Sequence, residues 1–164
     1  PEGSDVIVRD HVKWTGERKE VFALPEVTKR DPCRRTEVVL PEQSIDMDLW
    51  LRFLGWAISE GGICMRKGAP YDFSITQRNK SMANVHEIRD LLDRLPFTYH
   101  ERFYAPTGDY NWKVHNKQLY TWLAEHVGIE CHKKRIPRQF MALPKEQLQL
   151  LFTTLMKGDG SWDN

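Results

Sequence analysis

The chain has 164 residues, 40% of them hydrophobic and 29% charged, which is enough for one modest core. Its 24 basic and 23 acidic residues give a formal net charge of +1, so any contact with nucleic acid must depend on local clusters of basic side chains. Three cysteines at irregular spacing argue against a disulfide scaffold and are typical of a reducing compartment. The lack of a long apolar run and of a secretory segment predicts a soluble, intracellular protein with no membrane partner.

The N-terminal region, residues 1–43, is expected to form a β-hairpin extension followed by a linker. DVIVRDHVKW and EVFALP are rich in strand-forming residues, and the polar TGER between them contains a turn glycine, so residues 6–24 predict a hairpin. The following TKRDPCRRTE is polar and basic, which fits either a solvated linker or an arm that lies along a polyanion. Because the chain begins with Pro1 rather than methionine, we expect an excerpt or a processed product.

The next segment, SIDMDLWLRFLGWAISEGG, predicts a helix that is buried on more than one side. Ser44 is the expected N-cap, and Asp46 and Asp48 fall in the first turn, where carboxylates complement the helix dipole. Apolar side chains then cover almost the whole circumference, which is typical of a helix enclosed by other elements. Gly61–Gly62 is expected to end the helix.

Strand and helix patterns alternate through the rest of the chain. Two short strands precede an amphipathic helix with one apolar stripe, and a second strand pair around a PTGD turn precedes a short helix, a basic connector and a final helix. The segments are ICMRKG, YDFSITQRN, SMANVHEIRDLLDRL, FTYHERFY, YNWKVHN, KQLYTWLAEHVG, KKRIPRQFMAL and PKEQLQLLFTTLMKGDG. This order predicts an α+β fold.

Two apolar stretches, FLGWAISEGG and FTTLMKGDGS, each stop on an acidic residue beside a glycine, Glu60–Gly61 and Asp159–Gly160. Small residues in their last turns would let two such helices pack closely and bring the two carboxylates together. Close carboxylates repel each other unless a hard cation lies between them, and carboxylate and carbonyl oxygens suit Mg²⁺. A site of this kind is suited to phosphodiester hydrolysis. The small residues are Gly55, Ala57, Ser59, Thr153, Thr154 and Gly158.

These two segments resemble the paired motifs of the LAGLIDADG homing endonucleases, whose pattern falls on Gly55–Gly61 and Thr154–Gly160. The element order is similar to the α-β-β-α-β-β-α repeat of that family. The resemblance implies a LAGLIDADG homing-endonuclease fold with a four-stranded antiparallel sheet, plus the N-terminal hairpin extension. The first repeat would cover residues 44–143, and residues 144–164 would be the opening helix of a truncated second repeat. The chain departs from the common pattern in having threonine at Thr154 and glutamate at Glu60.

The resemblance also implies a function, the site-specific hydrolysis of phosphodiester bonds in double-stranded DNA, in the cytoplasm or on the nucleoid. Glu60, Asp159, Gly61 and Gly160 are expected to hold Mg²⁺, with Mn²⁺ as a substitute. Family members often lie within inteins or introns, although splicing itself is not expected of this chain. The alternative is a non-cleaving DNA-binding regulator or an RNA-splicing helper on the same scaffold. A second chain, or self-association through the Leu49–Ile58 face, would supply the missing half.

The remaining site residues are also implied by the resemblance. Gln77 in FSITQRNKS is expected to place the catalytic water, and Lys113 in WKVHNKQLY is expected to stabilise the charge that develops on the phosphate, with Lys117 as the second choice. Arginine pairs with guanine and lysine with phosphate, so basic residues on or beside the four strands predict a salt-dependent contact with DNA; the alternative is a solvated face of mixed charge. These residues are Arg66, Lys67, Arg78, Lys80, Arg102 and Lys113.

Overall fold

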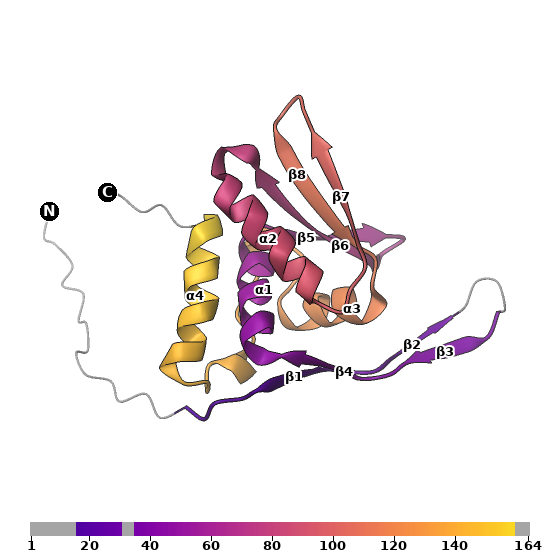
Figure 1. The fold of residues 1–164 in the computed structure, drawn as a ribbon. Helices are drawn as coiled ribbons and strands as arrows, with labels where there is room; N and C mark the ends of the chain where they lie inside the picture. The colour runs from indigo at the N-terminus through magenta and orange to yellow at the C-terminus, as the bar shows by residue number, and fades with distance from the viewer. Residues whose placement is uncertain (1–15, 31–34, 160–164) are drawn as a thin grey trace, which may run out of the picture.

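The computed structural model describes residues 16–30 and 35–159 (Figure 1). The elements are β1 (Val21–Leu24), β2 (Val27–Arg30), β3 (Glu37–Leu40), β4 (Gln43–Asp46), α1 (Met47–Ser59), β5 (Gly61–Arg66), β6 (Ala69–Arg78), a 3-10 turn (Asn79–Ser81), α2 (Met82–Arg94), β7 (Tyr99–Tyr104), β8 (Asp109–Val114), α3 (Lys117–His126), two further 3-10 turns (Cys131–Lys133 and Arg138–Phe140) and α4 (Lys145–Asp159). Within the described ranges, none of the helices has the length and apolarity needed to cross a membrane.

Strands β5 to β8 form a four-stranded antiparallel sheet in the order β5-β6-β8-β7. Its register places Phe73 opposite Val114 and Ile75 opposite Trp112, and all four side chains are buried. Because side chains alternate along a strand, these residues define the face that packs on the helices, and their neighbours define the opposite face, which is called the open face below. The sheet confirms the predicted α+β fold and the predicted four-stranded antiparallel sheet.

Helix α1 lies at the centre of the molecule, with ten of its 13 residues buried. Its Leu49–Ile58 face is enclosed by the rest of this chain, so that face is not available for the self-association considered above. The N-cap is Asp46, whose carboxylate accepts a hydrogen bond from the Leu49 N–H at 2.8 Å. The prediction of Ser44 as the N-cap was wrong because the preceding strand, β4, continues through it to Asp46.

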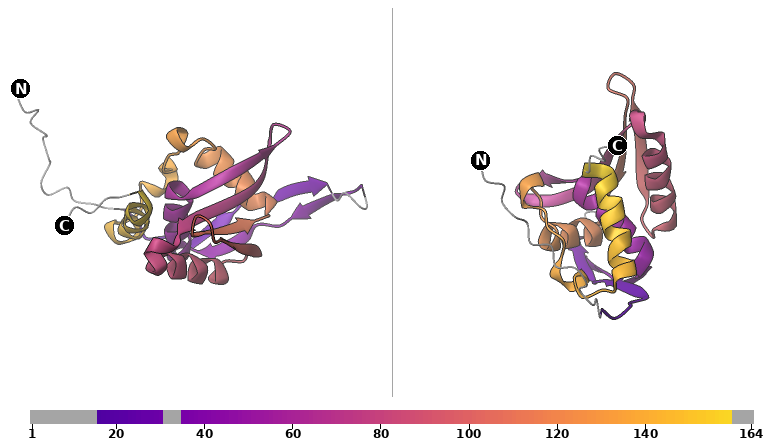
Figure 2. Two further views of the ribbon diagram at one scale, coloured as in Figure 1. Left: turned by 90° about the horizontal axis from the view of Figure 1, so that it is seen from above. Right: turned by 90° about the vertical axis from the view of Figure 1, so that its left-hand side faces the viewer.

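Strands β1 to β4 form a long antiparallel ribbon that projects from the body of the molecule (Figures 1 and 2). One register runs through its two ladders, from Val21 opposite Asp46 to Arg30 opposite Glu37. Where a linker was expected after β1, the structure therefore has β2 and β3. The hairpin predicted over residues 6–24 falls partly on residues 6–15, which lie outside the described part of the chain, and its described strand pairs with β4.

The ribbon is interrupted at Pro25 and Pro41, which have no N–H to donate to a ladder. The Gln118 side chain of α3 is 1% exposed and lies at this break. Its Nε2 donates to the carbonyl oxygens of Pro25 at 3.0 Å and Pro41 at 2.8 Å, and its Oε1 accepts from Gln43 Nε2 at 3.1 Å. Helix α3 therefore fixes the ribbon to the body where its own hydrogen bonds are missing.

Candidate functional site

Helices α1 and α4 lie side by side and parallel, with their C-terminal ends together (Figures 1 and 2). A Cβ atom on Gly55 of α1 would lie 2.7 Å from the Thr154 Cβ of α4, too close for any side chain. Near the helix ends, a Cβ on Gly158 would overlap the Ser59 side chain and lie 3.1 Å from Glu60 Cγ. The small residues therefore permit the close approach that the sequence predicted, and the last turn of α4 contacts the residue that caps α1.

The end of this helix pair concentrates negative charge. The last carbonyl groups of a helix have no partner within it, and the helix dipole places partial negative charge there. Glu60 caps α1 and adds a carboxylate, and α4 ends at Asp159. The Asp159 side chain and Gly160 lie outside the described part of the structure. Two helix ends and one described carboxylate therefore meet at a position that favours a cation.

Lys134 occupies one side of this position. Its Nζ donates to the carbonyl oxygens of Ile58 at 2.8 Å and Gly61 at 2.5 Å, and lies 3.4 Å from that of Ala57. The ammonium thus satisfies carbonyl groups at the end of α1, directly beside Glu60. Lys134 could not be singled out from the sequence because nothing local distinguishes it from the other basic residues of its connector.

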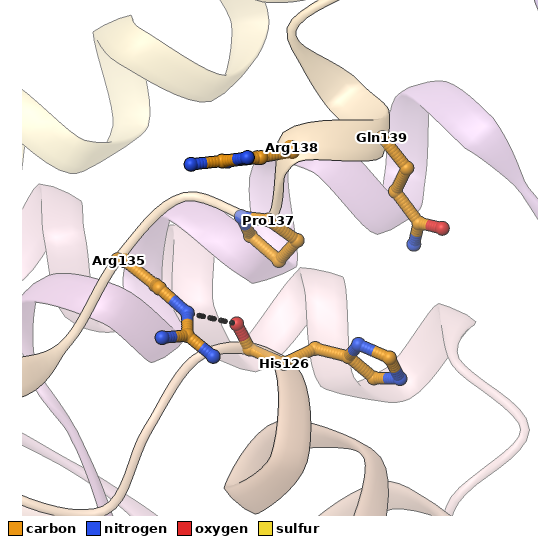
Figure 3. Close-up of a pocket in the computed structure, with 5 residues that line it drawn as sticks. All are labelled: His126, Arg135, Pro137, Arg138 and Gln139. Atoms are coloured by element: carbon orange, nitrogen blue, oxygen red, sulfur yellow. Dashed lines mark hydrogen bonds between the residues drawn. The ribbon is translucent and has the colours of Figure 1, made fainter.

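The connector that carries Lys134 is fixed to the end of α3. The Arg135 N–H donates to the Val127 carbonyl at 3.0 Å, and its Nε donates to the His126 carbonyl at 3.4 Å (Figure 3). This anchoring directs Lys134 toward α1. An adjacent cavity carries two guanidinium groups and is lined by His126, Arg135, Pro137, Arg138 and Gln139.

Glu60 also lines a cleft where β6 ends and β8 begins. The Thr76 N–H donates to the Glu60 carbonyl at 3.3 Å, which joins the end of α1 to β6. Gln77, the next residue of β6, lines the same cleft, together with Arg78 and Asp109, whose charged groups approach to 3.6 Å. The structure therefore brings together Glu60 and Gln77, two of the predicted catalytic residues.

Neither of the predicted catalytic lysines lies in this cleft, whose described lining contains no lysine. Lys113 Nζ is 3.3 Å from Asp72 Oδ2, further along the sheet. Lys117 Nζ donates to the Thr28 carbonyl at 2.8 Å and thus holds the ribbon. Both positions follow from the strand register and from the packing of α3, which the sequence pattern did not specify.

The open face of the sheet carries part of the predicted DNA-binding set. The register places Arg78, Arg102 and Lys113 on it, beside the polar Thr76 and Asn111. The other predicted residues lie at the sheet's ends: Arg66 and Lys67 at the β5–β6 turn, and Lys80 in the 3-10 turn after β6. All six of the basic side chains predicted to bind DNA are exposed. The basic groups are thus accessible, but they do not form one continuous cluster on a single face.

The residues at the helix ends fit a hard divalent cation in the type of donor they supply. Glu60 supplies carboxylate oxygens at the end of α1, where Lys134 already pairs with the Ile58 and Gly61 carbonyl groups and where α4 also ends. The Gly61 carbonyl, expected as a further ligand, accepts a hydrogen bond from Lys134 instead. Between residues 16 and 30 and between 35 and 159, no group of three or more His, Cys, Asp or Glu side chains could hold a metal ion.

Comparison with known proteins gave a structural similarity only. No protein-family model and no curated protein matches the sequence. Among solved structures, the chain is similar to the homing endonuclease I-DmoI in complex with DNA and Mn, with a TM-score of 0.46 and 16% identity over 68% of this chain and 62% of that chain. It is also similar to the homing endonuclease I-WcaI bound to its DNA recognition sequence, with a TM-score of 0.42 and 19% identity over 72% and 54% of the two chains. The chain spans less than two thirds of these proteins, and in its motifs and element order it resembles the LAGLIDADG homing endonucleases.

Proposed function

We propose that the chain is part of a metal-dependent endonuclease that binds double-stranded DNA on its open face and cleaves it beside Glu60. The observation that carries the proposal is the meeting of two helix ends at a carboxylate, next to a sheet face with accessible basic side chains. This arrangement puts a site suited to a cation within reach of a surface suited to phosphates.

Glu60 and Asp159 would hold Mg²⁺ or Mn²⁺, with Gly160 supplying a carbonyl oxygen. The ion would supply Lewis acidity and activation of water. Gln77 lines the same cleft as Glu60, but the register puts it on the helix-facing side of β6 with Ile75, so its amide would orient a water molecule from that side, at the end of the strand. Lys134 would fix the end of α1, and with it Glu60, because its ammonium donates to the Ile58 and Gly61 carbonyl groups.

On the open face, Arg78, Arg102 and Lys113 would contact the duplex. Their side chains are exposed, and strands can enter a major groove to present such groups to base edges and phosphates. Binding would therefore weaken steeply as the salt concentration rises.

The test is a Glu60→Gln variant assayed for cleavage and binding with a pool of random-sequence duplexes in the presence of Mg²⁺, with cut ends captured and sequenced. Cleavage at recurrent sites by the wild type, lost in Glu60→Gln with DNA affinity retained, would support the proposal. Glu87→Gln is the matched control. Glu87 lies on α2, pairs with Lys157 of α4 and does not line the cleft. Binding without cleavage in the wild type would instead favour the non-cleaving DNA-binding module.

A further inference from the structure

Asp72 is a buried carboxylate on the face of the sheet that is otherwise open. Its residue is 3% exposed, and the register places it on the same face as Ser74 and Lys113. Its Oδ2 lies 3.3 Å from Lys113 Nζ, whose side chain is 48% exposed. Cys64, on the neighbouring strand β5, lies opposite Asp72 in the register.

Burial of a carboxylate at this position lowers the stability of the fold. Asp72 Oδ1 is enclosed and has no hydrogen-bond partner among the described residues. A buried polar atom left without a partner destabilises a fold, and an ionised one does so more strongly. The carboxylate is therefore best explained by what it does to Lys113.

The ion pair with Asp72 changes how Lys113 can bind DNA. A lysine that is free to move neutralises a phosphate and releases a counterion, whereas one already neutralised by a fixed carboxylate has little to gain from a phosphate. The ammonium still has N–H groups to donate to solvent or to a base edge. Arg78 differs, because its partner Asp109 is 3.6 Å away and its own side chain is 69% exposed.

We propose that Asp72 is a positioning residue that neutralises Lys113 and fixes it over the open face, so that Lys113 reads a base instead of binding the phosphate backbone. The inference rests on the proposed binding of DNA to this face. The acceptors that a fixed ammonium fits best are O6 and N7 of guanine, which lie together in the major groove. Asp72 and Lys113 would therefore specify a guanine at one position of the target.

The first test is a double-mutant cycle on the salt dependence of binding to one random-sequence duplex. In the wild-type background, Lys113→Met should leave the slope of log K against log salt nearly unchanged. Asp72→Asn should make that slope steeper by about 0.9, because it frees one lysine for a phosphate, and Lys113→Met in the Asp72→Asn background should reverse the change. Equal effects of Lys113→Met in both backgrounds would overturn the inference.

The second test is selection from a pool of duplexes with a randomised core, performed with the wild type, Asp72→Asn and Lys113→Met. We expect the wild type to prefer guanine at one position and both variants to lose that preference while they keep the others. Identical preferences in all three would overturn the inference alone, whereas a wild type that binds no duplex would overturn the proposed function. Lys113→Met leaves the buried Asp72 carboxylate without its partner and could fold poorly for that reason. The double variant Asp72→Asn/Lys113→Met removes both charges, so it serves as the folded reference.

Discussion

The end of the α1–α4 pair and the open face of the sheet both carry charge, but they hold it in different ways. At the helix ends, Glu60 is positioned by helices packed too closely to admit a side chain at Gly55, and Lys134 is held by the carbonyl groups at the end of α1. On the open face, exposed groups such as Arg78 and Arg102 project into solvent from separate strands. A change in the first region should therefore act through geometry and be large, and a change in the second should act through screened charge and be graded.

The largest effect is expected where the two helices are closest. Gly55→Val would place side-chain atoms against Thr154 and the α4 backbone, and overpacking at such a contact should lower the free energy of unfolding by about 3 kcal/mol or more. Gly62→Ala is the control, because no atom lies within 4 Å of an added Cβ there, and it should change stability by less than about 0.5 kcal/mol. Equal urea midpoints for the two variants would show that the helices are not held at this separation.

A smaller loss is expected from Lys134→Met, which leaves the carbonyl groups of Ile58 and Gly61 without the ammonium. Unpaired, partly buried acceptors cost about 1–3 kcal/mol, so the urea midpoint should fall. Lys133→Met is the matched control on the same connector. Lys133 pairs only at the surface, with Glu130, and its loss should cost less than about 1 kcal/mol. A larger effect at Lys133 would contradict the assigned contacts.

These two positions also show what could be predicted from the sequence. The close contact of α1 and α4 at Gly55 was predictable because the pattern that predicts it, small residues followed by an acidic residue and a glycine, lies within the sequences of those two helices. Lys134 was not, because its role depends on a contact with Ile58, 76 residues away, through a connector of uniform basic character. The pairing of Asp72 with Lys113 was unpredictable for the same reason, because a strand register rather than a local sequence pattern brings the two together.

On the sheet, the pair of Glu101 and Arg89 should give a modest dependence of stability on pH. Two hydrogen bonds from the Arg89 guanidinium hold the pKa of Glu101 below its usual value, against the opposing effect of burial, and Trp112 Nε1 also donates to it. A lowered pKa means that the stabilisation is complete above the ordinary value near 4.5 and is lost as the pH falls through the folded-state value. Glu101→Gln should remove about 0.5–1 kcal/mol at pH 7 and nothing at low pH. Urea unfolding at both pH values measures this, and an equal loss at both would contradict it.

The smallest effect concerns the reactivity of Cys64, which is exposed on the sheet. Hydrogen bonding to Asp72, and the partial loss of solvent around the sulfur, raise the pKa of the thiol and so slow alkylation at neutral pH. In a Cys33→Ser/Cys131→Ser background, Asp72→Asn should speed alkylation a few-fold, and duplex DNA should slow it if the duplex covers the open face. A rate unchanged by Asp72→Asn would contradict the effect of Asp72 on the thiol, and a rate unchanged by the duplex would place the duplex elsewhere.

Paramagnetic broadening by Mn²⁺ would show whether the joined helix ends hold a divalent cation. Amide signals of labelled wild-type protein should broaden at the end of α1, around Glu60 and Gly61, and in the last turn of α4 at low Mn²⁺. The Glu60→Gln variant should lose this selective broadening while its other signals stay unchanged. Broadening confined to acidic side chains elsewhere on the surface, or the same pattern in both proteins, would contradict a cation site at the helix ends.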